Sequence, residues 1–119
     1  MSFSGLLDLN RLATFITTGS QFSKQEMERG WGDLTKVPGG PNDLLALLEN
    51  NIRKGISLPD LHACCGKDDF LLDHNHAFVE AAKRLGVPLA YIENDGAHNW
   101  DYWDNMLPWA LKQMGFPRK

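Results

Sequence analysis

The stretch Leu61-His62-Ala63-Cys64-Cys65-Gly66-Lys67-Asp68-Asp69 decides the fold class of this chain. Its first five residues form a short run without alternating polar and apolar side chains, which is typical of a strand buried on both faces of a parallel sheet. Gly66 ends this run. A second run of the same kind, Leu89-Ala90-Tyr91-Ile92-Glu93, lies further along the chain. The two runs predict two buried strands of one sheet.

A helix is predicted between these two strands. Asp73 is a candidate N-cap for it, and Gly86 is a suitable C-terminal stop. Its apolar side chains recur at helical spacing, at Phe78, Ala81, Ala82 and Leu85. Because a strand, a helix and a second strand form a crossover unit, the two strands are predicted to be parallel neighbours.

The first half of the chain carries weaker signals. Met1 to Ser4 is a short strand candidate. Residues 6–40 contain many glycines, so they are predicted to be a long irregular connection, such as a lid or a pocket wall. Asn42 or Asp43 can cap a short amphipathic helix over residues 44–49, in which three leucines share one face.

The end of the chain predicts a last helix, with apolar residues at helical spacing from Trp103 to Met114. Pro108 has no backbone N–H, so we expect a kink or a restart of this helix near Asn105. All these elements together predict an α/β fold with about three mostly parallel strands and flanking helices.

Length and composition limit the classes of protein to consider. A chain of 119 residues corresponds to about one domain, so residues 1–119 are expected to form a single unit. The hydrophobic content of 43% is that of a globular protein and argues against a disordered chain. The net charge of -3 is spread along the chain, which argues against nucleic acid or an anionic membrane as the partner. Without an apolar run of about 20 residues or a signal-peptide pattern, we expect a cytoplasmic protein.

The cysteines and histidines do not have the spacing of a metal site. Cys64 and Cys65 are adjacent and point to opposite faces of a strand, so reduced, buried thiols are expected. His74 and His76 are two residues apart and cannot share one metal ion on a helix. No C-x-x-C or H-x-x-x-H spacing is present, and neither Gly30-Trp31-Gly32 nor Gly39-Gly40 is followed by a helix that carries a phosphate-binding lysine. We therefore expect neither a metal nor a cofactor.

Polar clusters follow both buried strands at the point where each strand ends. Gly66-Lys67-Asp68-Asp69 follows the first strand, and Asp95-Gly96-Ala97-His98 follows the second. Because ligands bind outside the carboxyl ends of parallel strands, an aspartate and a histidine are expected to face one another there. A carboxylate that accepts the imidazole Nδ1–H leaves Nε2 free as a general base. This arrangement is two thirds of a catalytic triad.

These motifs resemble the C-terminal half of α/β-hydrolase esterases. Gly66-Lys67-Asp68-Asp69-Phe70-Leu71-Leu72 and Gly96-Ala97-His98-Asn99-Trp100-Asp101-Tyr102-Trp103 are similar to segments of the tributyrin esterase, esterase D and S-formylglutathione hydrolase group. Ser2-Phe3-Ser4-Gly5 and residues 42–48 also resemble that group, so the resemblance covers nearly the whole chain. It implies a serine esterase that hydrolyses short acyl esters or thioesters.

The resemblance implies roles for individual residues. In this family the acid lies three residues after the glycine that ends the strand, and the base follows the last strand. Asp69 is then the acid and His98 the base of a Ser-Asp-His triad, with Asp68 as the competing acid. Trp100, Tyr102 and Trp103 are assigned to packing rather than chemistry.

The chain departs from the family because the G-x-S-x-G nucleophile elbow is absent. The serines of the chain lie in no such motif: Ser2, Ser4, Ser20, Ser23 and Ser57. The N-terminal stretch that builds the oxyanion hole in this family is absent too. We therefore expect a partial α/β-hydrolase domain over residues 1–119, which lacks the half with the nucleophile and is inactive alone.

The resemblance also implies an open sheet edge. Met1 to Ser4 would be the sixth of eight strands, and the strand that should pair with it is absent from the chain. Such an apolar edge is prone to association, either with the N-terminal half of the same protein or with a second copy. The alternative function is a non-catalytic small α/β module that self-associates through this edge.

Overall fold

The structure is a computed structural model, and it describes residues 1–16 and 23–117. The chain divides into two compact units. The first, which we call the sheet unit, consists of Met1–Leu6 and Leu58–Lys119. The second, which we call the helical unit, consists of Leu7–Ser57.

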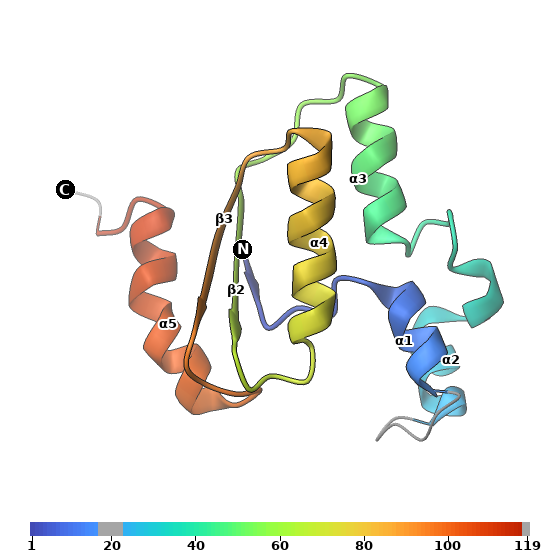
Figure 1. Cartoon of the computed structure of the whole chain (residues 1–119), viewed down its shortest axis with the longest axis horizontal. Helices are drawn as coiled ribbons and strands as arrows, with labels where there is room; N and C mark the ends of the chain where they lie inside the picture. Colours follow the sequence, from blue (N-terminus) through green and yellow to red (C-terminus); the bar gives the residue numbers. More distant parts are fainter. Residues whose placement is uncertain (17–22, 118–119) are drawn as a thin grey trace. The chain divides into compact units, whose positions relative to one another are not determined.

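The sheet unit is built on three parallel strands (Figure 1). The central strand, β2 (Leu61–Gly66), pairs with β1 (Ser2–Phe3) on one side and with β3 (Leu89–Asn94) on the other. Leu61 lies opposite Leu89 and Gly66 lies opposite Asn94, so β2 and β3 end at the same level. Four consecutive residues of β2 are buried, because helices cover both sides of the strand. The predicted α/β class and the parallel strands are confirmed.

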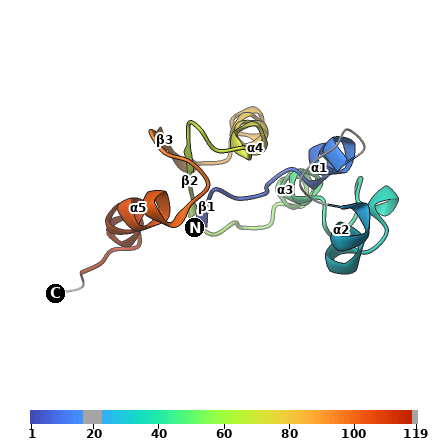
Figure 2. The ribbon, with the colours of Figure 1, turned by 90° about the horizontal axis from the view of Figure 1, so that it is seen from below.

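Two helices cover opposite faces of this sheet, α4 (Leu72–Leu85) on one and α5 (Trp100–Gln113) on the other (Figure 2). On the α5 side, a buried cluster consists of Cys64, Tyr102 and Met106. Four partly buried side chains pack against this cluster: Phe3, Ile92, Trp103 and Trp109. The sheet is therefore held between two apolar helix faces.

The helix between the strands forms as expected, but its N-cap was predicted wrongly. α4 begins at Leu72, and Leu71 occupies the N-cap position without a side-chain hydrogen bond. Asp73 lies inside the first turn instead, where a negative charge favourably faces the positive end of the helix dipole. Gly86 ends the helix in the left-handed conformation, as predicted.

The last helix does not restart near Asn105. α5 runs without interruption from Trp100 to Gln113, with Pro108 inside it. Asn99 caps its N-terminus, because its side chain accepts a hydrogen bond from the Tyr102 N–H at 3.0 Å. Pro108 is exposed, so the carbonyl that lost its helical partner can be hydrated. The helix therefore tolerates a proline that the sequence rule treats as a break.

The helical unit corrects the prediction of a long irregular connection over residues 6–40. This part contains two helices, α1 (Leu9–Ile16) and α2 (Lys24–Trp31), and a short 3-10 helix, η1 (Leu34–Lys36). Ser23 and Glu26 form a reciprocal capping box at the start of α2. Gly32, with φ +74°, is the C-cap that ends α2. Gly32 therefore ends a short helix, whereas the sequence pattern alone argues against one.

The helix α3 (Leu44–Arg53) completes this unit, and Asp43 is its N-cap. The carboxylate of Asp43 accepts hydrogen bonds from the N–H groups of Ala46 and Gly39 and from the Asn10 side chain. Where the structure describes burial in this unit, the buried apolar side chains are Leu9, Leu12, Met27, Leu34, Val37 and Leu48. Of the three leucines expected on one buried face, Leu44 and Leu47 are exposed.

The helices of residues 1–16 and 23–117 include none that is both long and apolar enough to cross a membrane.

Candidate active site

Two glycines bring the loops after β2 and β3 into contact. The Asp68 N–H donates to the carbonyl of Gly96 at 2.9 Å, and the Lys67 N–H donates to the carbonyl of Asn94 at 2.9 Å. A Cβ atom on Gly66 would lie 2.2 Å from the Gly96 carbonyl oxygen, which is inside any allowed contact. This approach therefore requires glycine at position 66, and it fixes the two loops against each other.

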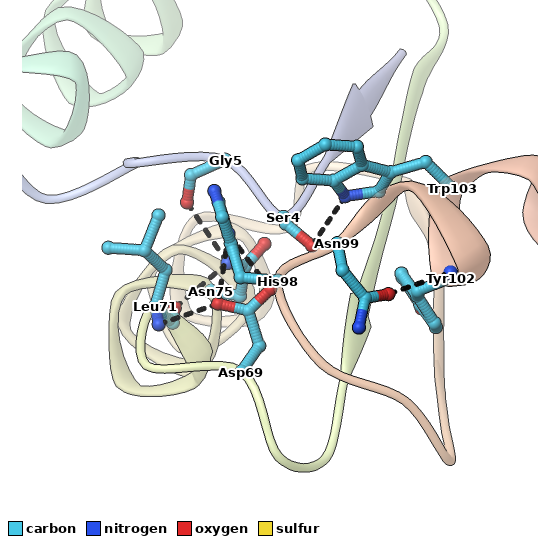
Figure 3. A network of polar contacts seen from close by, with 9 residues as sticks. All are labelled: Ser4, Gly5, Asp69, Leu71, Asn75, His98, Asn99, Tyr102 and Trp103. Carbon is cyan, nitrogen blue, oxygen red and sulfur yellow. Dashed lines mark hydrogen bonds and ion pairs between the residues drawn. The ribbon is translucent and has the colours of Figure 1, made fainter.

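The loops place Asp69 against His98 (Figure 3). The His98 Nδ1 atom lies 3.1 Å from Oδ2 and 3.3 Å from Oδ1 of Asp69. Asp69 Oδ1 also accepts a hydrogen bond from the Leu71 N–H at 2.8 Å, which orients the carboxylate. Asp68 is exposed and contributes its backbone N–H to the loop contact. The aspartate that faces the imidazole is therefore Asp69 and not Asp68.

Burial is unequal across this pair. The Asp69 side chain is 0% exposed, whereas the His98 side chain is 32% exposed. With Nδ1 directed at the carboxylate, the proton-accepting nitrogen of the neutral ring is Nε2. A buried carboxylate that orients a partly exposed imidazole is the arrangement that general-base catalysis requires.

Aromatic rings surround the imidazole of His98. The Phe70 ring lies 4.7 Å from it, centroid to centroid, at an interplanar angle of 52°. Trp103 meets it nearly edge-on, at 5.0 Å and 87°, and Trp100 packs on Trp103 in the same way. Of the aromatic residues expected to pack in the core or in a pocket wall, Tyr102 is buried, whereas Trp100 is 74% exposed and packs on Trp103 outside the core.

An open, mostly apolar cavity of about 410 Å³ lies beside these tryptophans. Its lining residues are Phe3, Trp100, Trp103, Asp104 and Leu107. Trp103 borders both this cavity and the His98 ring. The neighbourhood of the imidazole is therefore apolar on the α5 side.

The cysteines are structural rather than nucleophilic. Cys64 and Cys65 are both free and fully buried. Burial, and then the nearby charge of Asp69, raises the pKa of the Cys65 thiol to about 12. Burial also raises the pKa of the Cys64 thiol. Since the thiolate is the reactive form, neither side chain is suited to attack a substrate.

Of the other histidines, His76 pairs with a carboxylate. The His76 Nε2 atom lies 2.6 Å from Oε2 of Glu93, which also accepts a hydrogen bond from the Tyr91 hydroxyl at 2.9 Å. The hydrogen bond with His76 is the main reason that the pKa of Glu93 is lowered. Among the residues that the structure describes, no three metal-binding side chains come together.

Two polar residues beside the site were not identified from the sequence. Asn75 is fully buried in α4, and Ser4 is 3% exposed at the end of β1. A signal for Asn75 existed, because it shares one helix face with Phe78 and Ala82 and is the polar member of that face. Ser4 had no such signal. Of the other serines, Ser20 lies outside the described residues.

No family model matches the sequence. An acetyl esterase of Caldicellulosiruptor saccharolyticus is 33% identical over 86 residues, which are 72% of this chain and 32% of the relative. The S-formylglutathione hydrolase of Staphylococcus aureus superimposes with a TM-score of 0.78 at 27% identity, over 94% of this chain and 42% of that protein. A fluorophosphonate-binding serine hydrolase of the same organism gives a TM-score of 0.77 at 26% identity, with the same coverage.

The chain thus spans less than half the length of each of these proteins. The three are named as an acetyl esterase, an S-formylglutathione hydrolase and a serine hydrolase, and the two solved structures superimpose on nearly the whole chain. The sequence and the fold of the chain are therefore similar to part of an esterase of the α/β-hydrolase type.

Proposed function

We propose that this chain carries the acid and the base of a serine esterase, with Asp69 and His98 in those roles. The observation that supports the proposal is the buried Asp69 carboxylate at 3.1 Å from His98 Nδ1, at the carboxyl ends of two parallel strands. The similarity to an acetyl esterase and an S-formylglutathione hydrolase favours small acyl esters or thioesters as substrates.

In this mechanism His98 Nε2 takes the proton of a serine hydroxyl as the oxygen attacks the acyl carbon. The alcohol or thiol leaves with that proton, and an acyl-enzyme remains. His98 then activates a water molecule, which releases the acid and restores the serine. Asp69 holds the ring with Nδ1–H toward itself and stabilises the imidazolium in both steps.

The nucleophile in this proposal is supplied from outside the 119 residues, since G-x-S-x-G is absent from the sequence. The chain is then a partial domain that is inactive by itself, in a protein that we place in the cytoplasm. The open edge of β1 would receive a strand from the N-terminal part of the same protein or from a second copy. We propose neither a metal nor a cofactor for the reaction.

A chimera tests the proposal directly. The 119 residues replace the matching part of the Staphylococcus aureus S-formylglutathione hydrolase, and hydrolysis of p-nitrophenyl butyrate is measured for the chimera and for the 119-residue chain alone. We expect turnover by the chimera and none above background by the short chain. In the chimera, His98→Ala should lower kcat by about 10³-fold or more, because the serine loses its base.

Matched aspartate variants identify the acid. Asp69→Asn should lower kcat by about 10²- to 10⁴-fold in the chimera, because an amide no longer stabilises the imidazolium. Asp68→Asn makes the same chemical change on the neighbouring exposed residue and should leave kcat within about twofold. Loss of activity in Asp68→Asn alone would assign the acid to Asp68. Turnover by the short chain that depends on His98 would place the nucleophile inside these residues.

A further inference from the structure

The two residues after β1, Ser4 and Gly5, form a turn that we call the β1 turn. Apart from glycines, Ser4 is the one residue with a positive φ in the described part of the chain, at +48°. This conformation is sterically unfavourable for a residue with a Cβ atom. Its N–H donates to the carbonyl of Cys64 at 2.8 Å, so the pairing with β2 continues into the turn. The unfavourable conformation persists because contacts on both sides of the turn hold it in place.

The first contact leads from the turn to the histidine. The hydroxyl oxygen of Ser4 accepts a hydrogen bond from Nε1 of Trp103 at 3.1 Å. The Trp103 ring lies edge-on against the imidazole of His98, with centroids 5.0 Å apart (Figure 3). Ser4 therefore fixes the aromatic ring that limits the rotation of the imidazole on one side.

The second contact leads from the turn to the aspartate. The side-chain amide of Asn75 donates to the carbonyl of Gly5 at 3.0 Å and to the carbonyl of Leu71 at 2.9 Å. The N–H of Leu71 in turn donates to Oδ1 of Asp69. Asn75 is fully buried, so water does not compete for these bonds. The side chain of Asn75 therefore connects the β1 turn to the loop that carries Asp69.

We propose that the β1 turn couples the orientation of Asp69 to that of His98, with Ser4, Trp103 and Asn75 as positioning residues. These three side chains touch neither a nucleophile nor a substrate in this scheme. They hold the two loops so that Nδ1–H stays directed at the carboxylate and Nε2 stays available. The inference rests on the proposed function for its role in catalysis, but the coupling itself is a property of the 119-residue chain.

The test measures the position of the ring proton in the ¹⁵N-labelled 119-residue chain. Long-range ¹H–¹⁵N correlation spectra at pH 8 distinguish the Nδ1–H and Nε2–H forms of each histidine, and a His98→Ala spectrum assigns the signals of His98. We expect the Nδ1–H form to dominate in the unmodified chain. Trp103→Phe and Ser4→Ala should each lower the ratio of the two forms by a factor of about 2 to 10, as expected for one loosened hydrogen bond.

Matched controls separate positioning from general destabilisation. Trp109→Phe makes the same exchange in the same helix and in the same apolar cluster, and it should leave the ratio unchanged. On the aspartate side, Asn75→Ala should lower the ratio, although the Asn75 amide donates to Gly5 and Leu71 and not to the imidazole. Phe78→Leu, one turn along α4, should not. Ser4→Ala removes one oxygen atom, so it remains informative if a larger change prevents folding.

The outcomes distinguish this inference from the proposed function. An unchanged ratio in Ser4→Ala and Trp103→Phe overturns the coupling, whatever the chimera does. Equal shifts in Trp109→Phe and Trp103→Phe also overturn it, because the effect is then one of packing. A shifted ratio confined to the positioning variants supports the coupling even if His98→Ala leaves the chimera active, which would contradict the proposed function alone.

Discussion

At the scale of single residues, the site depends on the absence of a side chain at Gly66 as much as on the side chains of Asp69 and His98. The backbone of Gly66 touches the backbone of Gly96, and the hydrogen bond from Asp68 to Gly96 forms beside that contact. The Asp69–His98 distance is therefore set by a contact between main chains. A change at Gly66 should reach both functional side chains without touching either one.

Gly66→Ala tests this contact. The new methyl group must push the Gly96 carbonyl away, so we expect a loss of about 1–3 kcal/mol in the free energy of unfolding and a lower Nδ1–H population of His98. Urea denaturation and the histidine spectra measure these two effects. Gly30→Ala is the control, because position 30 lies in α2 with open space around it, and the change should stabilise by about 0.5–1 kcal/mol. A Gly66→Ala chain as stable as the original would contradict the argument.

The thiols give a second prediction at this scale. With the Cys65 pKa raised to about 12, the thiolate fraction at pH 8 is on the order of 10⁻⁴. We expect a thiol reagent such as 5,5′-dithiobis(2-nitrobenzoate) to modify Cys64 and Cys65 only after addition of guanidinium chloride. The absorbance of the released chromophore should then correspond to two thiols per chain. Rapid reaction of either thiol under native conditions would show that β2 is less protected than its burial indicates.

At the scale of elements, side-chain caps set where helices begin, and the cap of α3 makes the stability of that helix depend on pH. Asp43 caps α3 and gathers hydrogen bonds from three groups. Burial opposes its charge, but the hydrogen bonds from Gly39, Ala46 and Asn10 prevail, and the pKa of Asp43 is lowered. The start of α3 is therefore most stable when this carboxylate is ionised.

The sign of the pH dependence follows from that lowered pKa. The stabilisation by Asp43 is fully present above the pKa of an unfolded aspartate, about 3.9, and is lost as the pH falls through the lower folded value. Asp43→Ala should cost about 1–2 kcal/mol at pH 7 in denaturation followed by circular dichroism, and less at pH 2. Asp60→Ala removes an exposed aspartate as the control. A cost that stays constant from pH 7 to pH 2 would show that ionisation of Asp43 is irrelevant.

At the scale of the whole molecule, the outer edge of β1 governs association. Among the described strands, β1 pairs with β2 only. The Ser4 N–H is used toward Cys64, so the alternation of a parallel strand directs the N–H of Phe3 to the outer edge. The chain therefore presents a backbone donor where a further strand of an esterase, or a second copy, could pair.

Sedimentation equilibrium tests pairing with a second copy. We expect concentration-dependent dimers of the 119-residue chain, weakened about 3- to 10-fold more by Phe3→Pro than by Phe3→Ala, since only proline also removes the outward donor. Both variants lose the same contact with the apolar cluster, so their difference reflects the lost donor together with the fixed φ of proline. A chain that remains monomeric at all concentrations would contradict self-pairing and favour pairing within the longer esterase domain.

The sequence by itself determined the strand–helix–strand unit, because the apolar runs of β2 and β3 and the spacing along α4 leave few alternatives. It also indicated that an aspartate and a histidine meet at one sheet edge, since parallel strands end together. It misjudged residues 6–40, where local caps outweigh the glycines, and the sequence rule did not distinguish a restart at Pro108 from the continuous helix that α5 forms. In both places opposing local contributions to helix stability nearly cancel, and residue types alone do not show which one prevails.

Only the tertiary structure decided which aspartate faces His98 and what holds the pair. Asp68 and Asp69 are adjacent in the sequence, and the loop contact with Gly96 turns one outward and buries the other. The β1 turn joins Ser4 to a tryptophan 99 positions away and Gly5 to an asparagine 70 positions away. Such bonds depend on packing between elements that are distant along the chain, and no local pattern in the sequence encodes them.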